Sequence, residues 1–362
     1  MSEASQDKPD GEASWSDSRG WNKASGIIVP YLIERVPEFH SLTDLRQRGW
    51  NNPEGDKFFQ LQRQRADQSS EKTARYFYQL MLRIGREIQA ATGAFSIVNP
   101  ASQQPEILDM CMAPGGFLQT ALSFNPGSKA LGFSLPISHG GHKILLPRRA
   151  DVDLRFLDVT MLAADMGSPN IPVDHIDAEK FLPRQIDTSR VFDLVLCDGQ
   201  VLRTHDRAPY REKREARRLT TVQLALGLEH LRSGGTMIVL LHKLEAWDTL
   251  CLVRLFTRFA SIKLFKPIPG HAKRSSFYMV ASCVQSQQPE ALAAISKWKN
   301  IWNAATFAPD EKYWEEIRKG EEPVSDVLEE FGPELIKLGR KVWDVQAKAL
   351  AQAPFIKQEG NQ

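Results

Sequence analysis

The sequence predicts an α/β fold, in which a doubly wound and mostly parallel β-sheet carries helices on both faces. Short apolar runs alternate with helical segments between residues 106 and 259, as in repeated β-α units. An apolar run over residues 106–112 passes through a Pro-Gly-Gly loop into a helix that starts at Phe117. Asp158, Asp198 and Lys243 each follow an apolar run, at the strand ends where such sheets bind ligands. We therefore expect the ligands along the carboxyl edge of one sheet.

Three features precede the alternating region. Residues 1–20 are rich in Ser, Asp, Glu and Gly and contain no apolar run, which is typical of a disordered leader. Residues 26–33 are compatible with a short strand or a docking segment. Ser70 is a suitable N-cap for a helix that runs to about Thr92 with its apolar residues on one face, and Gly93 is placed to end it.

Seven strands are expected in and after the alternating region, at residues 106–112, 129–134, 154–157, 191–197, 236–241, 261–266 and 277–283. Helices are expected at residues 220–231 and 246–259. The last two strands should pair antiparallel, because the loop between them is too short for a crossover helix. Beyond Pro289 the pattern predicts helices at 289–306, 310–318 and 324–351. Apolar anchors at helical spacing usually pack against a core, so we expect this for Trp298, Trp302, Trp314 and Trp343.

Composition narrows the class of protein. The formal net charge is +2 and the pI is about 8.3, so a nucleic-acid surface would need local clusters of charge. The four cysteines are scattered without a Cys-x-x-Cys pair, which favours buried thiols in a reducing compartment over disulfides or zinc. Neither a secretory signal nor a membrane-spanning run is evident. We expect a cytoplasmic or nuclear protein with no metal centre and no membrane partner.

The loop around Gly115 is the most informative motif. Pro114, Gly115 and Gly116 stop the preceding strand and permit close approach of a ligand. The free amides of the helix that starts at Phe117 would favour an anionic group. An ordinary β-turn-α connection is the alternative. NAD is disfavoured, because the Gly-x-Gly-x-x-Gly fingerprint is absent.

Asp198 and Lys243 are the candidates for catalysis. A hydroxyl group is a poor nucleophile at neutral pH, so the transfer of a group to it needs a side chain that accepts its proton or stabilises the alkoxide. A lysine can do either, and a neighbouring carboxylate can orient the ammonium. An exposed ion pair of little energetic value is the alternative for two such residues.

The loop resembles the first motif of two groups of RNA methyltransferases that use S-adenosylmethionine: the FtsJ/RrmJ-like 2′-O-ribose enzymes, and the enzymes that methylate carbon 5 of cytosine. Later segments resemble the successive motifs of the FtsJ/RrmJ-like family, in the family's order. They are residues 109–117, 132–136, 157–160, 194–198, 234–243 and 273–278. The cytosine enzymes need a cysteine directly after a proline, and this chain has no Pro-Cys pair. The required nucleophile is therefore missing.

The resemblance covers about residues 70–284 and implies a Rossmann-like class I methyltransferase with S-adenosylmethionine as cofactor and RNA as partner. It implies that the loop holds the methionine part of the cofactor, that Asp158 accepts the adenine amino group, and that Asp198 and Lys243 belong to the family's Lys-Asp-Lys-Glu tetrad. The cofactor-binding residues would be Asp109, Ala113, Pro114, Gly115, Gly116, Phe117, Ser134, Asp158 and Asp198. The expected organisation is a leader at 1–20, the methyltransferase domain at 21–288, and a helical C-terminal extension with a flexible tail at 289–362.

Three positions depart from the family pattern. Ser275-Ser276 is followed by Phe277-Tyr278, where the family has the glutamate of the tetrad. Tyr78 and Gln79 stand where its first lysine belongs, and Lys72 lies about one and a half helical turns earlier. Ser134 replaces an acidic residue that contacts the cofactor's ribose in many relatives. A non-catalytic relative that binds RNA or senses the cofactor is therefore the rival hypothesis.

A basic segment follows Asp198. Arg203, Arg207, Arg211 and Arg214 would rise beside the strand ends and could bind RNA phosphates. Lys143, Arg148 and Arg149 could extend this surface. Glu212 and Glu215 interleave with the arginines, so a solvated helix face with internal ion pairs is the alternative.

Overall fold

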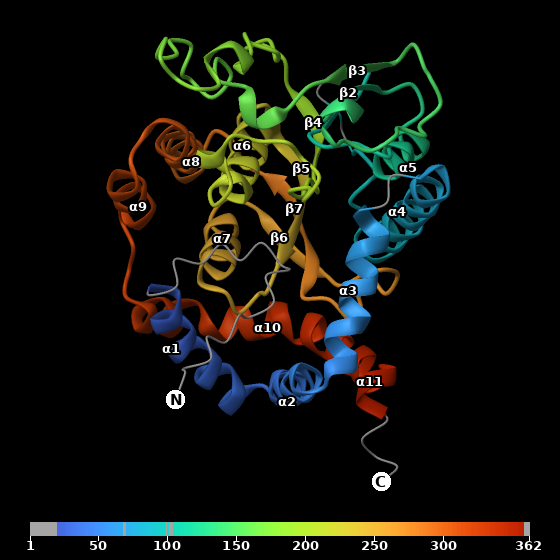
Figure 1. Cartoon of the computed structure of the whole chain (residues 1–362), viewed down its shortest axis with the longest axis vertical. Coiled ribbons are helices and arrows are strands. Elements are labelled where there is room, and N and C mark those ends of the chain that lie inside the picture. The colour runs from blue at the N-terminus through green and yellow to red at the C-terminus, as the bar shows by residue number, and fades with distance from the viewer. Residues whose placement is uncertain (1–19, 68–69, 99, 101–103, 358–362) are drawn as a thin grey trace, which may run out of the picture.

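A computed structural model describes residues 20–67, 70–98, 100 and 104–357 (Figure 1). The expected leader lies outside these residues except for Gly20, and so does the end of the expected flexible tail. No helix in the described ranges is long and apolar enough to cross a membrane.

A seven-stranded sheet forms the centre of the molecule, in the order β3-β2-β1-β4-β5-β7-β6. Its strands are β1 (Glu106–Asp109), β2 (Lys129–Ser134), β3 (Val152–Phe156), β4 (Phe192–Cys197), β5 (Leu231–His242), β6 (Ser261–Phe265) and β7 (Ser276–Val284). β7 lies between β5 and β6 and runs antiparallel to both, whereas the pairs among β1 to β5 are parallel. The predicted fold class and the predicted antiparallel final pair are confirmed.

Helices cover both faces of the sheet (Figure 1). On one face α4 (Glu71–Thr92) and α5 (Gly116–Phe124) pack over a core that includes Phe117, Leu196 and Ile238. On the other face α6 (Glu215–Glu229) and α7 (Trp247–Thr257) pack over a larger core that includes Val195 and Val239. Alternate residues of β4 and β5 thus belong to opposite cores, as strand geometry requires.

The predicted helix after Ser70 is confirmed with both of its caps. The Ser70 hydroxyl accepts a hydrogen bond from the Thr73 amide, and Gly93 ends the helix with a left-handed φ of 73°. The segment left open at residues 26–33 is part of a helix, α1 (Gly20–Arg35). Its buried residues Ala24, Ile28 and Leu32 recur every fourth position, which is helical spacing. Two further helices, α2 (Pro37–Asn51) and α3 (Pro53–Asp67), follow it.

The C-terminal helices form close to their predicted positions: α8 (Pro289–Phe307), α9 (Asp310–Arg318), α10 (Val324–Ala351) and the short α11 (Pro354–Lys357). Trp298, Trp302 and Trp343 are buried in the larger core, as expected, and Trp314 is partly buried beside a small cluster that α8 and α9 share. Trp343 of α10 packs edge-on against Phe39 of α2 with ring centroids 5.2 Å apart. The chain's two ends therefore meet on one side of the sheet.

Short 3₁₀ turns complete the connections: η1 (Ile137–His139), η2 (Val159–Met161), η3 (Ala178–Lys180) and η4 (Pro209–Arg211). η2 follows β3 and η4 precedes α6, so both lie at the carboxyl edge of the sheet. That edge carries the residues discussed next.

Candidate functional site

The loop after β1 depends on two glycines. Gly115 has a φ of 103°, a left-handed conformation that side chains disfavour, and it precedes the first turn of α5. A Cβ on Gly116 would lie 2.6 Å from the Met81 Cβ and 2.7 Å from the Tyr78 carbonyl oxygen of α4. These glycines let the loop rest directly on α4 while the N-terminal amides of α5 stay directed along the carboxyl edge.

A second segment lies over this loop. The Leu145 amide donates to the Pro114 carbonyl oxygen at 3.0 Å, and a Cβ on Gly115 would approach the Leu146 Cβ to 2.9 Å. Beside it, a hollow of about 410 Å³ is lined by Arg75, Tyr78, Gln79 and Leu145. Tyr78 and Gln79, which replace the family's lysine, thus face open space next to the loop.

Two buried acceptors beside the loop have no hydrogen-bond partner among the described residues: Asp109 Oδ2, at the end of β1, and Ser134 Oγ, at the end of β2. The other Asp109 oxygen accepts from the Cys111 amide at 3.2 Å. Buried polar atoms are nearly always satisfied, so these two atoms indicate a polar ligand. They fit S-adenosylmethionine, which carries ammonium, hydroxyl and amino donors.

Asp109 and Asp198 end adjacent parallel strands and influence each other. Burial, together with the nearby Asp198 carboxylate, raises the pKa of Asp109 well above its ordinary value. Burial also raises the pKa of Asp198 to about 7. Because two close carboxylates resist simultaneous ionisation, a cationic ligand between them would be favoured.

Asp158 has different partners from those expected. One carboxylate oxygen accepts from the Thr160 amide and hydroxyl at 2.9 and 2.8 Å. The other lies 2.7 Å from Arg211 Nη2 and 3.3 Å from His205 Nε2. Although burial raises the pKa of Asp158, His205 and Arg211 hold it below its ordinary value. A carboxylate offers about four acceptor sites, so an adenine amino group would need one of these partners to move.

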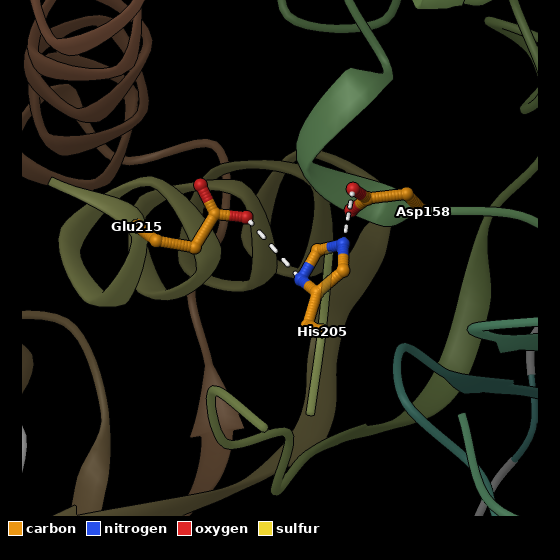
Figure 2. Close-up of side chains that lie close together, drawn as sticks. All are labelled: Asp158, His205 and Glu215. Atoms are coloured by element: carbon orange, nitrogen blue, oxygen red, sulfur yellow. Dashed lines mark ion pairs between the residues drawn. The ribbon is translucent and has the colours of Figure 1, made fainter. Parts of the chain in front are cut away.

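His205 lies between two carboxylates (Figure 2). Its Nδ1 is 3.8 Å from Glu215 Oε1, and one ligand atom from each of Asp158, His205 and Glu215 lies within 4.8 Å of the others. This is metal-ligand spacing. However, Arg211 Nη2 donates to both carboxylates, so a guanidinium already supplies the positive charge there.

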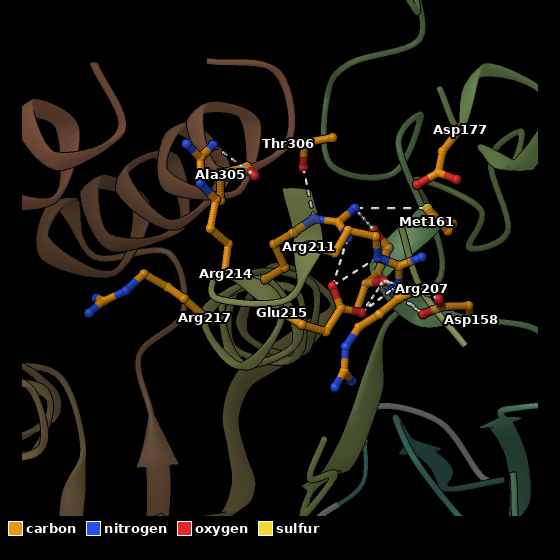
Figure 3. A network of polar contacts seen from close by, with 12 residues as sticks. Asp158, Met161, Asp177, Arg207, Arg211, Arg214, Glu215, Arg217, Ala305 and Thr306 are labelled. Atoms are coloured by element: carbon orange, nitrogen blue, oxygen red, sulfur yellow. Dashed lines mark hydrogen bonds and ion pairs between the residues drawn. The ribbon is translucent and has the colours of Figure 1, made fainter. Parts of the chain in front are cut away.

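Glu215 is the centre of a buried network (Figure 3). It accepts from Arg211 Nε and Arg218 Nη1, both at 2.9 Å. Arg218 also donates to the Thr160 carbonyl and the Thr306 hydroxyl, both at 3.0 Å. The network therefore joins η2 and α6 to α8.

The arginines expected to bind RNA divide into two groups. Arg211 and Arg214 are only 2% and 9% exposed, and Arg214 donates to main-chain oxygens at the end of α8. Because their side chains are buried, Arg211 and Arg214 are not accessible to RNA phosphates, contrary to the expectation that they bind RNA. Arg207 pairs with Glu212 at 2.8 Å, and Arg203 is exposed. Three further basic residues are exposed close in sequence to Leu145 and Leu146, which lie over the glycine loop. They are Lys143, Arg148 and Arg149.

The pairing register places Leu240 beside Asp198. Cys197 pairs with Val239 across the parallel β4–β5 ladder, so the next positions are Asp198 and Leu240. Lys243 lies past the end of β5 with a left-handed φ of 47°, which is uncommon for a residue other than glycine. Its amide donates to the Ser275 carbonyl at 3.1 Å, and its carbonyl accepts from the Ala246 amide at 2.8 Å. The backbone at Lys243 is therefore held on both sides.

Sequence reasoning missed a set of contacts beside Lys243. Arg46 of α2 pairs with the buried Glu245 at 2.6 Å and donates to Gln346 of α10 at 3.1 Å and to the Ser275 hydroxyl at 3.4 Å. Burial raises the pKa of Glu245, but the charge of Arg46, the hydrogen bonds from the Glu245 amide and from Arg46, and the charge of Lys243 together lower the pKa below its ordinary value. Glu245 Oε2 has no hydrogen-bond partner among the described residues. Because Arg46 lies 199 residues from Glu245, no local pattern could reveal the pair.

Comparisons with known proteins agree with this fold. The family model of the FtsJ-like methyltransferases matches residues 86–283, more than half of the chain. None of the curated proteins matches.

Three solved structures are among those to which the chain shows a weak similarity. The fibrillarin/Nop5p complex has 11% identity over 49% of this chain and 72% of that one, with a TM-score of 0.32. A TehB-like S-adenosylmethionine-dependent methyltransferase from Corynebacterium glutamicum has 17% identity, 54% and 92% coverage, and a TM-score of 0.29. An rRNA methylase from Streptococcus thermophilus has 9% identity, 58% and 95% coverage, and a TM-score of 0.29. At these scores the likenesses carry no argument about fold or function.

Proposed function

Because the chain belongs to the FtsJ-like methyltransferase family, we propose that it transfers a methyl group from S-adenosylmethionine to a ribose 2′-hydroxyl of RNA. The observation that carries the proposal is the pair of unsatisfied buried acceptors, Asp109 Oδ2 and Ser134 Oγ, at the ends of adjacent strands beside the glycine loop. A buried acceptor without a donor costs about 1–3 kcal/mol, and a bound ligand with donors would recover it.

The residues around the loop would hold the cofactor. S-adenosylmethionine supplies a methyl group on a positively charged sulfonium. Asp109 would accept from the cofactor's ammonium, and Ser134 from a ribose hydroxyl. The loop from Ala113 to Phe117 would lie along its methionine part, with the amides of α5 directed to the carboxylate. Asp198, ionised once a cation is beside it, would favour the sulfonium electrostatically.

The acceptor hydroxyl would lie between Asp198 and Lys243. The Lys243 ammonium would stabilise the negative charge that develops on the oxygen, and Asp198 would orient the ammonium or the hydroxyl. Holding the hydroxyl in line with the methyl group would supply much of the remaining acceleration. The exposed side chains of Arg203, Lys143 and Arg148 would contact RNA phosphates near this edge.

Methyl transfer with labelled S-adenosylmethionine and separated cellular RNA pools tests the proposal. Nuclease digestion should yield a labelled 2′-O-methyl nucleotide. Lys243→Ala should lower the transfer rate at least about 100-fold while the cofactor Kd, measured by calorimetry, changes by less than about threefold. Lys263→Ala, which removes an exposed lysine of β6, is the matched control and should leave both unchanged. Unchanged turnover in Lys243→Ala would remove the assigned role.

A second candidate function is favoured by one observation. The last pair of the β4–β5 ladder is Cys197 with Val239, so the next residue of β5, the apolar Leu240, lies level with Asp198, where a polar tetrad member would be needed. A non-catalytic protein that binds S-adenosylmethionine or RNA would need only the loop and the basic side chains. The same assay separates the two: cofactor binding with no labelled nucleotide in any RNA pool would favour this candidate.

A further inference from the structure

His242, the last residue of β5, lies on the same face of the sheet as the glycine loop. Val239 and Leu241 belong to the core under α6 and α7, whereas Leu240 packs against the opposite core with Phe117 and Tyr278. Side chains alternate along a strand, so His242 projects to the face of Leu240. Asp198 projects to that face too, since Leu196 belongs to the same core.

A hydrogen bond to Gln200 sets the tautomer of His242. His242 Nε2 lies 3.0 Å from the carboxamide oxygen of Gln200, two residues after Asp198. A carboxamide oxygen only accepts hydrogen bonds, so Nε2 carries the proton in the neutral imidazole. Nδ1 is then the basic nitrogen, and the ring is half-buried rather than sealed in the core.

The titratable groups around His242 come from three sides of the edge. Ser276 stands directly across the antiparallel β5–β7 ladder, and its hydroxyl is 2.6 Å from His271 Nδ1. Burial lowers the pKa of His271 to about 3, with further lowering from Lys266, Arg274 and His242. His271 is therefore a neutral and weak base, so of these two neighbouring imidazoles His242 is the one suited to proton transfer. Asp198 follows β4, and Lys243 is the next residue along the chain.

We propose that His242 is the general base of the methyl transfer, with Gln200 as its positioning residue. The inference rests on the proposed function. The hydroxyl O–H bond breaks and the proton passes to His242 Nδ1, while an oxygen lone pair forms the new O–CH₃ bond. The C–S bond breaks and its electron pair stays on sulfur, so the products are a methyl ether, a thioether and an imidazolium. Lys243 then serves only to stabilise the charge on oxygen, and His242 supplies the base that the incomplete tetrad lacks.

The test is the labelled-methyl assay on the full chain with His242→Ala, with and without added imidazole. General bases contribute about 10²–10⁴-fold, so kcat should fall at least about 100-fold while KM for S-adenosylmethionine and its calorimetric Kd stay near the unchanged values. Free imidazole should restore activity in proportion to its concentration, which loss of a purely structural contact would not allow. Gln200→Leu removes the acceptor of the Nε2 proton and should move the acidic limb of the kcat–pH profile to lower pH, whereas Gln200→Glu places a carboxylate beside the imidazolium and should move the limb to higher pH.

His40→Gln is the matched control, since His40 is an exposed histidine of α2 paired only loosely with Asp44 at 3.7 Å, and it should not change kcat. Transfer by His242→Ala within about threefold of the unchanged protein, or a loss that imidazole does not restore, would overturn the role of His242 alone. Absence of transfer by the unchanged protein on every RNA pool would overturn the proposed function and this role together.

Discussion

Glu215→Gln should destabilise the protein strongly, because it removes the charge that balances two buried guanidinium groups. Glu215 and Arg211 are both 2% exposed, and Arg218 is fully buried. Each arginine donates to Glu215 at 2.9 Å, and among the residues that the structure describes only Arg211 has a second carboxylate partner, Asp158. Breaking a buried ion pair from one side costs about 3–5 kcal/mol, so a loss of that size is expected.

Urea unfolding followed by far-UV circular dichroism measures this loss. Glu212→Gln is the matched control, three residues earlier, because the Glu212 side chain is 63% exposed, and its partner Arg207, which is 9% exposed, keeps a hydrogen bond to the Leu202 carbonyl. It should cost only about 0–1 kcal/mol. A loss below about 1 kcal/mol in Glu215→Gln, or equal losses in the two variants, would refute the reasoning that the network stabilises by buried charge balance.

Two further predictions concern the carboxyl edge. Burial raises the pKa of Asp198 from 3.8 to about 7. Between about pH 4 and 7 the folded protein therefore keeps a proton on this carboxyl group that the unfolded chain releases. The stability that this group contributes is fully present below about pH 4 and is lost as the pH rises to about 7. When the pH is raised from about 5 to about 7, the free energy of unfolding in urea should fall by roughly 2–3 kcal/mol more for the unchanged protein than for Asp198→Asn. If the free energy of unfolding depended on pH in the same way in both proteins, the raised pKa would be contradicted. Arg46→Met should remove the cation that pairs with the buried Glu245 and lower the free energy of unfolding by about 3–5 kcal/mol, which a lower urea midpoint would show. Arg46→Lys should recover part of this loss. An Arg46→Met midpoint equal to that of the unchanged protein would show that the ion pair contributes nothing to stability.

The sheet was predictable because its signals are local. Each strand is a short apolar run between breakers, and the caps Ser70 and Gly93 mark their helix by side-chain chemistry and a left-handed turn. The loop at Gly115 was also predictable, since a Pro-Gly-Gly sequence between a strand and a helix has few structural uses.

The partners of charged residues were not predictable. The spacing of Arg211 and Glu215 suits both an exposed helix face and a buried network, and only packing against α8 decides between them. Asp158 was expected to be available to adenine, but Arg211, which approaches from 53 residues away, takes one of its oxygens. Lys243 and Asp198 were predicted to lie close together because both follow strands, and this stays a prediction. The register that sets Leu240 level with Asp198 depends on the alignment of β4 with β5, which local sequence does not encode.

The contact of Arg46 with Gln346 spans 300 residues, and this separation has a consequence for biosynthesis. At about 5–20 residues per second, α10 leaves the ribosome roughly 15–60 seconds after α2. During that interval Phe39 and Leu42 of α2, which are buried in the finished protein, have no α10 to cover them. The nascent chain would therefore carry the uncovered apolar face of α2 until α10 has been made, and the time needed to translate the residues between them sets how long that face stays exposed.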